Sequence, residues 1–459
     1  MRLPELFLER MKELLGEEYE LWLESCGQMP VQGIRVNPAK LTPGQWEQIS
    51  PWEIRRVPWN LNGYYCQEKS RPARDVYYYA GLYYIQEPSA MAPAELLGVK
   101  PGHKVLDLCA APGGKSTQLG ARLEGRGLLV ANDVSASRAK ALLKNLEMAG
   151  VANICVTAEE PKRLAQVFSG FFDKILVDAP CSGEGMFRKE PELIKSWQER
   201  GPKEYVPVQR EILKQAVRML RPGGELVYST CTFSVEEDEG AVDWILAEEP
   251  DMELVPLALW EGARPGADKK PVIRLFPHRI RGEGHFVAKL KKRQREDGGS
   301  EGGKAPGEGV CRKDEKELEL LEQSDYLEWE RFLARPFDRH RLTVQFGQVY
   351  FLPEDFRRDW GFRYLRTGLL VGSLRRGRFE PSQAAAMALK SGEFARALSM
   401  DREDERVIRY LKGETVFLKE GEDFSKGWVL VCVDGFPLGW AKAAGGSLKN
   451  KYYPGWRWM

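Results

Sequence analysis

Residues 105–117 read VLDLCAAPGGKST, and this stretch decides the fold that we expect. Its first five residues form an apolar run typical of a buried strand, and Gly113 and Gly114 then lead into a helical pattern. Four more short apolar runs follow, with helical patterns at 136–148 and 208–220 between some of them: LLVAND (128–133), NICVT (153–157), KILVDA (174–179) and ELVYST (225–230). This alternation predicts an α/β fold with a mostly parallel, Rossmann-like sheet.

The rest of the chain divides around that sheet. Residues 1–95 predict an N-terminal α+β region, which we expect to contact RNA, and residues 96–290 predict the α/β core. Residues 291–315 carry six glycines between 298 and 309 and predict a flexible linker. Beyond the linker we expect two small α+β modules, at 316–375 and 376–459, with helices at 316–333 and 382–398.

Composition excludes several classes of protein. No apolar run approaches the length of roughly 20 residues that a membrane span needs, and the N-terminal residues do not resemble a secretory signal. The eight cysteines are never closer than 26 positions, so there is no CxxC pair for zinc or redox chemistry. We therefore expect a cytoplasmic protein with free thiols, without a metal, and a monomer.

The glycine-containing turn predicts a ligand site. A turn that follows the first strand of a parallel sheet lies at the edge where ligands bind. The Gly-Lys-Ser sequence resembles a phosphate-binding P-loop, but that motif needs a glycine where this chain has Cys109, and the dinucleotide pattern G-x-G-x-x-G is absent. The alternative is that the glycines only permit a tight turn.

Acidic residues end the next strands. Asp133 ends the second strand, where a carboxylate commonly binds ribose hydroxyls, so the turn and Asp133 together favour a nucleoside cofactor. By the same logic, Glu160 and Asp178 are candidates for the adenine side and for an amino group of the cofactor. Glu160 has the alternative of being a solvated surface charge.

Two cysteines follow two strand ends at this same edge. Cys181 follows the fourth strand and Cys231 the fifth. A cysteine alone is more often an inert buried residue, but two thiols beside a cofactor turn favour catalysis. Methylation of carbon 5 of cytosine needs a thiolate that first adds to carbon 6. We expect Cys231 to be this nucleophile, because Ser234 and Glu237 predict a capping box and hence a helix N-terminus beside it.

A family resemblance is carried by three stretches: LDLCAAPGGKS, DAPCSGEGMFRKEP and YSTCTFSVEEDE. They resemble the Sun/Fmu-type RNA 5-methylcytosine methyltransferases, as do IRVN (34–37) and IQEPSAM (85–91). The resemblance covers about residues 1–290. It implies a class I methyltransferase core with a seven-stranded sheet, S-adenosylmethionine as cofactor, Cys231 as nucleophile and Cys181 as the residue that assists release of the product.

The resemblance also implies residue roles around the cofactor. It implies cofactor contacts by the turn residues, by Asp133 and Asp178, and by Glu160, where the family usually has Asp. The turn residues concerned are Ala110, Ala111, Pro112, Gly113, Gly114, Lys115 and Ser116. Asp178 is also a candidate catalytic residue, because it could bond the cytosine ring nitrogen and amino group.

Besides residues 1–95, two regions are candidates for RNA contact. Phe187, Arg188 and Lys189 follow the Pro-Cys motif, and they could stack on a base and bind phosphates, or else pack the loop and lie in solvent. Residues 341–459 carry 20 Lys and Arg against 14 Asp and Glu. Within their last 20 residues, Lys449 and Lys451 lie among five aromatic residues, a pattern typical of RNA binding unless the aromatic residues are core.

The C-terminal residues refine the expected substrate. SLKNKYYP and LRRGRFEPS (374–382) resemble the RsmF/YebU-like ribosomal branch of the family, which implies that residues 376–459 form a PUA-like RNA-binding module. The expected function is formation of 5-methylcytosine in small-subunit (16S) ribosomal RNA. Two alternatives stay open: the same chemistry on transfer RNA, and a ribosome-assembly protein that binds RNA without catalysis.

Overall fold

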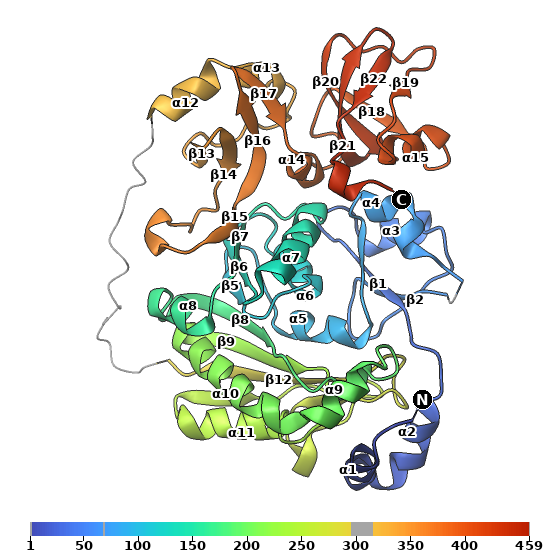
Figure 1. Cartoon of the computed structure of the whole chain (residues 1–459), viewed down its shortest axis with the longest axis vertical. Helices are drawn as coiled ribbons and strands as arrows, with labels where there is room; N and C mark the ends of the chain where they lie inside the picture. Colours follow the sequence, from blue (N-terminus) through green and yellow to red (C-terminus); the bar gives the residue numbers. More distant parts are fainter. Residues whose placement is uncertain (1, 68, 295–314, 459) are drawn as a thin grey trace.

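The computed structural model describes residues 2–67, 69–294 and 315–458, so most of the expected linker and Cys311 lie outside the described residues. Figure 1 shows the α/β core in the middle, the first two helices at one end of the molecule and two C-terminal modules at the other. No helix in the described ranges is long and apolar enough to cross a membrane.

The core is a mixed sheet with helices packed on it. Its order is β10-β12-β9-β8-β5-β6-β7-β15, and β11 pairs with β12. The strands are β5 (Lys104–Asp107), β6 (Leu128–Asn132), β7 (Ile154–Thr157), β8 (Phe172–Asp178), β9 (Leu220–Thr230), β10 (Met252–Val255), β11 (Ile273–Leu275), β12 (His285–Lys292) and β15 (Tyr364–Thr367). The helices are α5 (Ala92–Leu96), α6 (Gly114–Arg122), α7 (Ala136–Met148), α8 (Pro161–Val167), α9 (Leu193–Glu199), α10 (Pro202–Met219) and α11 (Glu239–Glu248).

The predicted fold class is confirmed, with a wider sheet than expected. Strands β5 to β9 run parallel, β12 pairs antiparallel with β9, and β10 pairs antiparallel with β12 and so runs in the same direction as β9. Their number agrees with the seven-stranded sheet that the resemblance implies, and β11 and β15 bring the described sheet to nine. Strand β15 comes from the C-terminal half and pairs with the edge strand β7, which it covers.

The N-terminal region is α+β, as expected. Its elements are α1 (Glu5–Leu15), α2 (Tyr19–Ser25), β1 (Gly33–Val36), α3 (Pro43–Ile49), β2 (Arg55–Arg56), β3 (Gly63–Tyr65), α4 (Val76–Tyr79) and β4 (Tyr83–Ile85), with sheet order β2-β3-β1-β4. This sheet shares one apolar core with the C-terminal module, in which Trp46 and Tyr83 join Val407 and Tyr410. The C-terminus accordingly lies beside α3 and α4 in Figure 1.

The C-terminal half contains two separate sheets. The first has the order β13-β14-β16-β17 and the second β18-β20-β21-β22-β19. The elements are α12 (Glu315–Glu322), α13 (Tyr326–Glu330), β13 (Leu342–Gln345), β14 (Gln348–Phe351), β16 (Leu369–Arg375), β17 (Arg378–Pro381), α14 (Gln383–Ala388), β18 (Ala397–Met400), α15 (Glu405–Leu411), β19 (Val416–Phe417), β20 (Gly427–Val433), β21 (Phe436–Ala444) and β22 (Ser447–Asn450).

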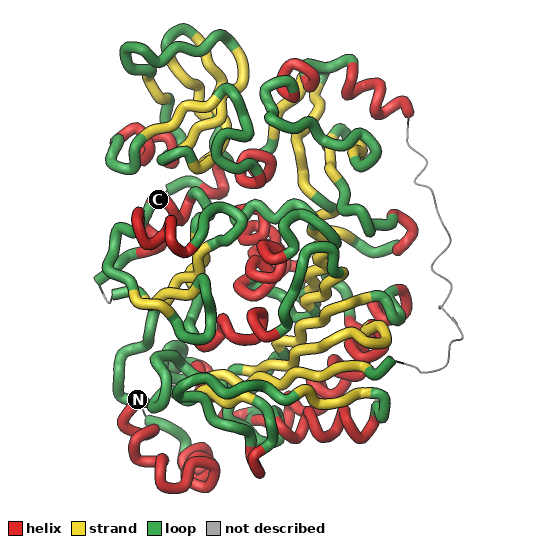
Figure 2. Tube along the Cα trace, turned by 180° about the vertical axis from the view of Figure 1, so that it is seen from behind, coloured by secondary structure: helices red, strands yellow, loops and turns green. Residues whose placement is uncertain are grey.

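Short 3-10 helices complete the described elements: η1 (Gly16–Glu18), η2 (Pro72–Arg74), η3 (Ser89–Met91), η4 (Glu184–Met186), η5 (Ala267–Lys269), η6 (Arg358–Trp360) and η7 (Pro454–Trp456). The tube in Figure 2 shows that the loops joining the elements take up much of the N-terminal region and of the C-terminal modules.

Three sequence expectations about the C-terminal half are corrected. The expected boundary between 375 and 376 is wrong, because Arg375 pairs with Arg378 inside the β16–β17 hairpin. The first sheet ends at Pro381 and the second begins at Ala397. The helix expected at 316–333 is two helices, α12 and α13, and the helix expected at 382–398 ends at Ala388. Leu389 has extended backbone, which ends that helix early.

Candidate active site

The turn after β5 lies at the carboxyl edge of the sheet. Gly113 is the N-cap residue of α6 and has φ +112°, a left-handed conformation that favours glycine. Three hydrogen bonds to two elements, β6 and α7, fix the backbone of this turn: Ala110 N donates to Asn132 O, Arg138 Nη2 to Ala111 O, and Asn145 Nδ2 to Pro112 O. The backbone of the turn is therefore held in one conformation.

Asp107 ends β5 beneath this turn. Ser116 Oγ donates to Asp107 Oδ2 at 2.6 Å, whereas Asp107 Oδ1 is buried and has no hydrogen-bond partner in the described protein. Burial raises the pKa of the Asp107 carboxyl to about 7, although the Ser116 hydrogen bond opposes this rise. A buried acceptor without a partner is costly, and it fits a donor on a bound ligand.

Two of the expected acidic contacts lie at the ends of the next strands. Asp133 is 3% exposed, and its Oδ1 accepts from Ser135 N at 3.0 Å. Asn132 joins the ends of β6 and β7, because it accepts from Thr157 Oγ1 and donates to Glu159 O. Glu160 is exposed and holds the N-cap position of α8 without a side-chain cap. This position agrees with the alternative of a solvated charge as well as with a ligand contact.

Asp178 ends β8 at the centre of this edge. Lys115 Nζ lies 2.6 Å from its Oδ2, Ser229 Oγ donates to its Oδ1 at 2.7 Å, and His285 Nε2 lies 3.5 Å from the same oxygen. Burial raises the pKa of Asp178, but Lys115 and His285 outweigh it and hold the pKa well below its usual range. Asp178 is therefore a carboxylate, able to accept but not donate hydrogen bonds.

The two candidate thiols meet at this edge. Cys181 Sγ lies 3.3 Å from Cys231 Sγ, although the residues are 50 positions apart in sequence. Both cysteines are partly exposed. The neighbouring Cys231 thiol and burial together raise the pKa of Cys181 well above its usual value. Cys181 therefore stays a neutral thiol beside Cys231.

Glu237 connects the loops that carry the two cysteines. Its Oε2 accepts from Ser182 N and from Gln209 Nε2, both at 2.9 Å. Ser182 Oγ and Thr232 Oγ1 lie 2.7 Å apart beside the same carboxylate. Burial raises the pKa of Glu237 to about 7, although the hydrogen bonds from Ser182 and Gln209 oppose this rise.

The capping box expected at Ser234 and Glu237 is wrong. Helix α11 begins only at Glu239, and residues 235–238 form a turn. Glu237 N does donate to Ser234 Oγ at 3.4 Å, but the Glu237 side chain turns away to bond Ser182. Cys231 is thus held by a buried polar network, and it does not stand directly at a helix N-terminus.

The residues after the Pro-Cys motif are mostly structural. Phe187 is 2% exposed and packs against Phe7 with ring centroids 5.1 Å apart, so it is not free to stack on a base. Arg188 is bound to Glu283 at 2.7 Å and donates to Ser25 O, which corrects the expected phosphate contact. Lys189 is exposed. Of these three residues, Lys189 is therefore the one for which an RNA contact is still predicted.

The C-terminal candidates lie at the end of the chain. Lys449 is exposed on β22, opposite Lys442 of β21. Lys451 is exposed too, 3.6 Å from Glu380 and near the Trp428 ring. Most of the aromatic residues around them, including Trp440, Tyr452 and Trp456, are core. Of the five, Tyr453 is the most exposed and Trp458 is intermediate.

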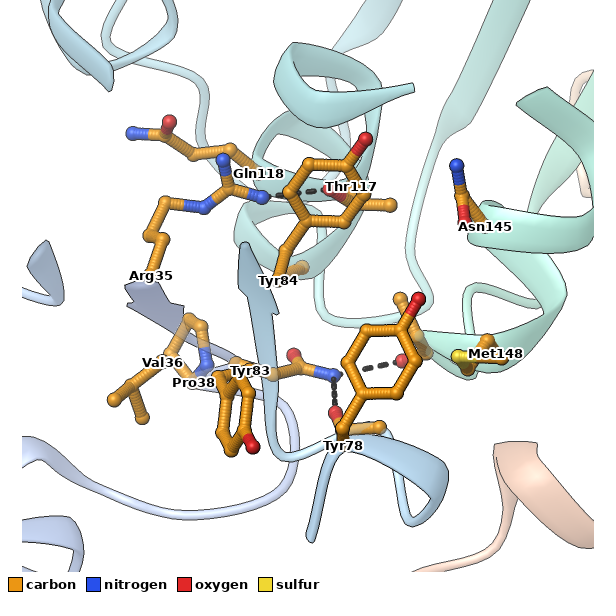
Figure 3. Close-up of a pocket in the computed structure, with 14 residues that line it drawn as sticks. Arg35, Val36, Pro38, Tyr78, Tyr83, Tyr84, Thr117, Gln118, Asn145 and Met148 are labelled. Carbon is orange, nitrogen blue, oxygen red and sulfur yellow. Dashed lines mark hydrogen bonds between the residues drawn. The ribbon is translucent and has the colours of Figure 1, made fainter. Parts of the chain in front are cut away.

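A cavity lies between the N-terminal sheet and helices α6 and α7. Figure 3 shows Arg35 of β1 reaching Thr117 of α6, with the Tyr84 ring beside them. Arg35 Nη2 donates to Thr117 Oγ1 at 2.6 Å, and Arg35 also bonds Gln86. Asn37 Nδ2 donates to Gly81 O and Ala149 O, so the IRVN stretch holds the N-terminal region against α6 and α7.

Sequence reasoning missed His285 and Asp107 as residues of the site and predicted another role for Glu237. His285 reaches Asp178 from β12, whose pairing with β9 places Phe286 opposite Thr230. Asp107 was visible in the strand VLDLC but was read as part of the strand alone. Glu237 was assigned to a helix cap. The register of β12 could not be read from the apolar pattern, whereas the acid inside a buried strand was a usable signal for Asp107.

Comparison with known proteins gives four consecutive family matches. Residues 94–291 match the 16S rRNA methyltransferase RsmB/F family, and residues 3–88 match the N-terminal domain of 16S rRNA methyltransferase RsmF. Residues 328–389 match the RsmF rRNA methyltransferase first C-terminal domain, and residues 397–458 match the methyltransferase RsmF PUA domain.

Whole-chain relatives and solved structures agree with these matches. The ribosomal RNA small subunit methyltransferase F of Erwinia tasmaniensis is 31% identical, with 98% of this chain and 95% of that protein covered. The protein of the same name from Escherichia coli O127:H6 gives the same values. NSun6 from Pyrococcus horikoshii, solved with SFG, has a TM-score of 0.55 at 25% identity over 64% of this chain and 99% of that one. A methyltransferase homologue from the same organism has a TM-score of 0.55 at 32% identity over 63% and 95%.

Proposed function

Because this chain belongs to the RsmB/F family of 16S rRNA methyltransferases, we propose that it forms 5-methylcytosine in small-subunit ribosomal RNA through a covalent Cys231 adduct. It is an S-adenosylmethionine-dependent rRNA methyltransferase, and the proposal concerns the target base, the mechanism and the residues. We also propose that it acts in the cytoplasm. The observation that carries the mechanism is the 3.3 Å approach of Cys181 and Cys231, which lie three residues after Asp178 in the loop that follows β8 and directly after β9, respectively.

The residues at the sheet edge fit a nucleoside cofactor. The turn 110–116 offers backbone groups that are held in place, Asp133 offers a carboxylate for ribose hydroxyls, and Asp107 Oδ1 offers a buried acceptor that lacks a partner within the described residues. Bound there, S-adenosylmethionine supplies an electrophilic methyl group on a sulfonium. Lys115 and Asp178 form an ion pair at the inner end of the turn, so the charge of that pair is nearly balanced before any ligand binds.

The chain's own residues supply the remaining chemistry. The Cys231 thiolate adds to carbon 6 of cytosine, and the electron pair of the carbon 5–carbon 6 bond makes carbon 5 a nucleophile that takes the methyl group. The Asp178 carboxylate can accept a hydrogen bond from the cytosine amino group or from a protonated ring nitrogen, which stabilises the adduct. A base then removes the proton from carbon 5, the double bond re-forms and the carbon 6–sulfur bond breaks. The neutral Cys181 thiol, 3.3 Å away, can hydrogen-bond the departing Cys231 sulfur.

Two cysteine variants test this mechanism. Cys231→Ala should abolish methyl transfer to 16S rRNA, because no thiolate attacks carbon 6, while S-adenosylmethionine still binds with its wild-type Kd. Cys181→Ala should accumulate a protein–RNA adduct that survives a denaturing gel, because release is slowed. Cys432→Ala is the matched control. It removes a buried thiol on β20, in the C-terminal half, and should retain methyl transfer.

The opposite results would overturn separate parts of the proposal. Methylation retained by Cys231→Ala would remove the nucleophile assignment, and a Cys181→Ala protein that runs free of RNA would remove the release role. Bisulfite mapping of cellular RNA with and without the protein identifies the modified cytosine. A modified transfer RNA with unchanged 16S rRNA would correct the substrate, and no change in any RNA would favour a binding protein without catalysis.

A further inference from the structure

Two hairpin tips of the first C-terminal sheet lie together and expose an unusual set of side chains. The β13–β14 hairpin turns at Phe346 and Gly347, and the β16–β17 hairpin turns at Arg376 and Gly377. Leu374 N donates to Gly347 O at 2.7 Å, so the two tips are neighbours. Figure 1 shows that β16 leads from β15, on the methyltransferase sheet, to the far end of this module. The tips therefore point away from the methyltransferase core.

The turn geometry does not explain the side chains at these tips. Both central residues of each turn have positive φ: Phe346 +51° and Gly347 +73°, Arg376 +51° and Gly377 +74°. Such two-residue hairpins strongly prefer Asn-Gly, Asp-Gly or Gly-Gly, because other side chains are strained at positive φ. The two other described hairpins of this kind use the preferred pairs, Asp434-Gly435 and Gly445-Gly446. Phe346 and Arg376 are thus the exceptions.

Neither residue is placed at its turn by packing. The Phe346 side chain is fully exposed, at 102%. Arg375, Arg376 and Arg378 are exposed as well, and no ion pair holds any of them within the described part of the chain. Arg375 and Arg378 are register partners across the hairpin, where two like charges directly opposite destabilise the pair. Three features of the tips therefore cost folding stability without a folding benefit.

We propose that these paired tips, defined by Phe346, Arg375, Arg376 and Arg378, form a second RNA-binding site, separate from the catalytic edge. An exposed aromatic ring stacks on an unstacked base, and arginines beside it bind the flanking phosphates. The occupant is a single-stranded or looped segment of ribosomal RNA remote from the target cytosine. The proposal rests on the proposed function, because it takes the same RNA as its ligand.

The test separates an RNA contact from a structural role. Phe346→Asn restores the residue that the turn prefers, so the melting temperature of the full-length protein should be unchanged or higher. Its affinity for transcribed 16S rRNA should fall by about fivefold or more, because one base loses its stacking partner. Leu320→Gln removes another exposed apolar side chain, 58% exposed on the acidic helix α12, and should leave the affinity unchanged.

The arginines are tested by the salt dependence of binding. Arg376→Gln combined with Arg378→Gln should lower the slope of log affinity against log salt by about 1.4 in magnitude, because two phosphate contacts to a single strand are lost. Lys100→Gln combined with Arg126→Gln removes the same charge from the amino edge of the core sheet and is the matched control.

Each further outcome decides the proposal. If the wild type methylates and binds 16S rRNA but the tip variants bind it equally well, the second site is wrong while the proposed function stands. If the tip variants bind naked rRNA normally but fail to methylate assembled small subunits, the tips contact a ribosomal protein and the RNA assignment is wrong. If the wild type neither binds nor methylates the rRNA, the failure lies in the proposed function.

Discussion

Single buried side chains hold the loops of the two thiol groups close together. Cys181 and Cys231 follow different strands, and Glu237 is the residue that bonds both of their loops, through Ser182 and Thr232. Asp178 is fixed in the same way by Lys115 and Ser229, which come from different elements. Because each of these side chains is oriented by several partners, small changes at one of them should displace the sulfur atoms.

The raised pKa of Glu237 predicts that the free energy of unfolding depends on pH. Its folded-state pKa is about 7, against an ordinary value of 4.5, so the folded protein holds this proton more tightly than the unfolded chain. The contribution of Glu237 to the stability of the fold is fully present below pH 4.5, and it is lost as the pH rises through 7. Glu237→Gln cannot ionise, so its stability relative to wild type should rise between these values by on the order of 3 kcal/mol. Chemical denaturation at several pH values measures this difference.

Glu236→Gln provides the control for this prediction. Burial raises the pKa of Glu236, but the hydrogen bonds from Ser234 and its own backbone, with Arg10, outweigh it and lower the pKa. The stability that wild-type Glu236 contributes therefore grows as the pH rises from its lowered folded-state pKa to the ordinary value of 4.5 and is full above that value, which is the opposite direction. A pH-independent difference for Glu237→Gln would show that its carboxyl ionises equally in the folded and unfolded states.

At the scale of elements, the parallel strands were predictable and their antiparallel neighbours were not. Strands β5 to β9 are buried on both faces, so each one is a continuous apolar run in the sequence. The position of His285 depends on the register of β12 against β9, and β15 joins the sheet from about 200 residues away, so neither followed from local pattern. The same limit explains Glu237, whose S-x-x-E spacing fits a cap but whose carboxylate bonds a distant loop.

The turn into α6 makes a prediction at this scale. In Gly113→Ala the new Cβ would lie 3.2 Å from Leu142 Cδ1 and 3.4 Å from Asn145 Cβ, and Asn145 holds the carbonyl of Pro112. The turn should therefore shift, and affinity for S-adenosylmethionine, measured by calorimetry, should fall about tenfold, equivalent to roughly 1.4 kcal/mol. Gly102→Ala shares a positive φ but meets open space, so it should lose some stability and keep the affinity. Equal affinities for both variants would show that the turn tolerates the methyl group.

At the scale of the molecule, the C-terminal half is part of the methyltransferase structure. Strand β15 covers the edge of β7, where Gly368 N donates to Ile154 O at 2.7 Å. Trp360 packs on Phe168 with ring centroids 4.8 Å apart. On the other side, Arg402 binds Asp75 at 2.7 Å, and Tyr77 donates to Asp434. The sequence showed the modules and the glycine-rich segment, but these contacts could not be read from it, because they join surfaces that are remote in the chain.

These contacts predict that the catalytic core is not a stable, soluble protein without the C-terminal half. A chain that ends at Lys292 would leave β7 as an open edge strand and expose Phe168, and both features favour association between molecules. It should elute as aggregates in size-exclusion chromatography and bind S-adenosylmethionine weakly, whereas co-expression with residues 315–459 should restore a soluble complex. Within the full chain, Trp360→Ala should destabilise the protein by about 3–5 kcal/mol, the usual cost of truncating a buried tryptophan. A monomeric 1–292 fragment with full-length affinity for the cofactor would show that the C-terminal half serves RNA recognition alone.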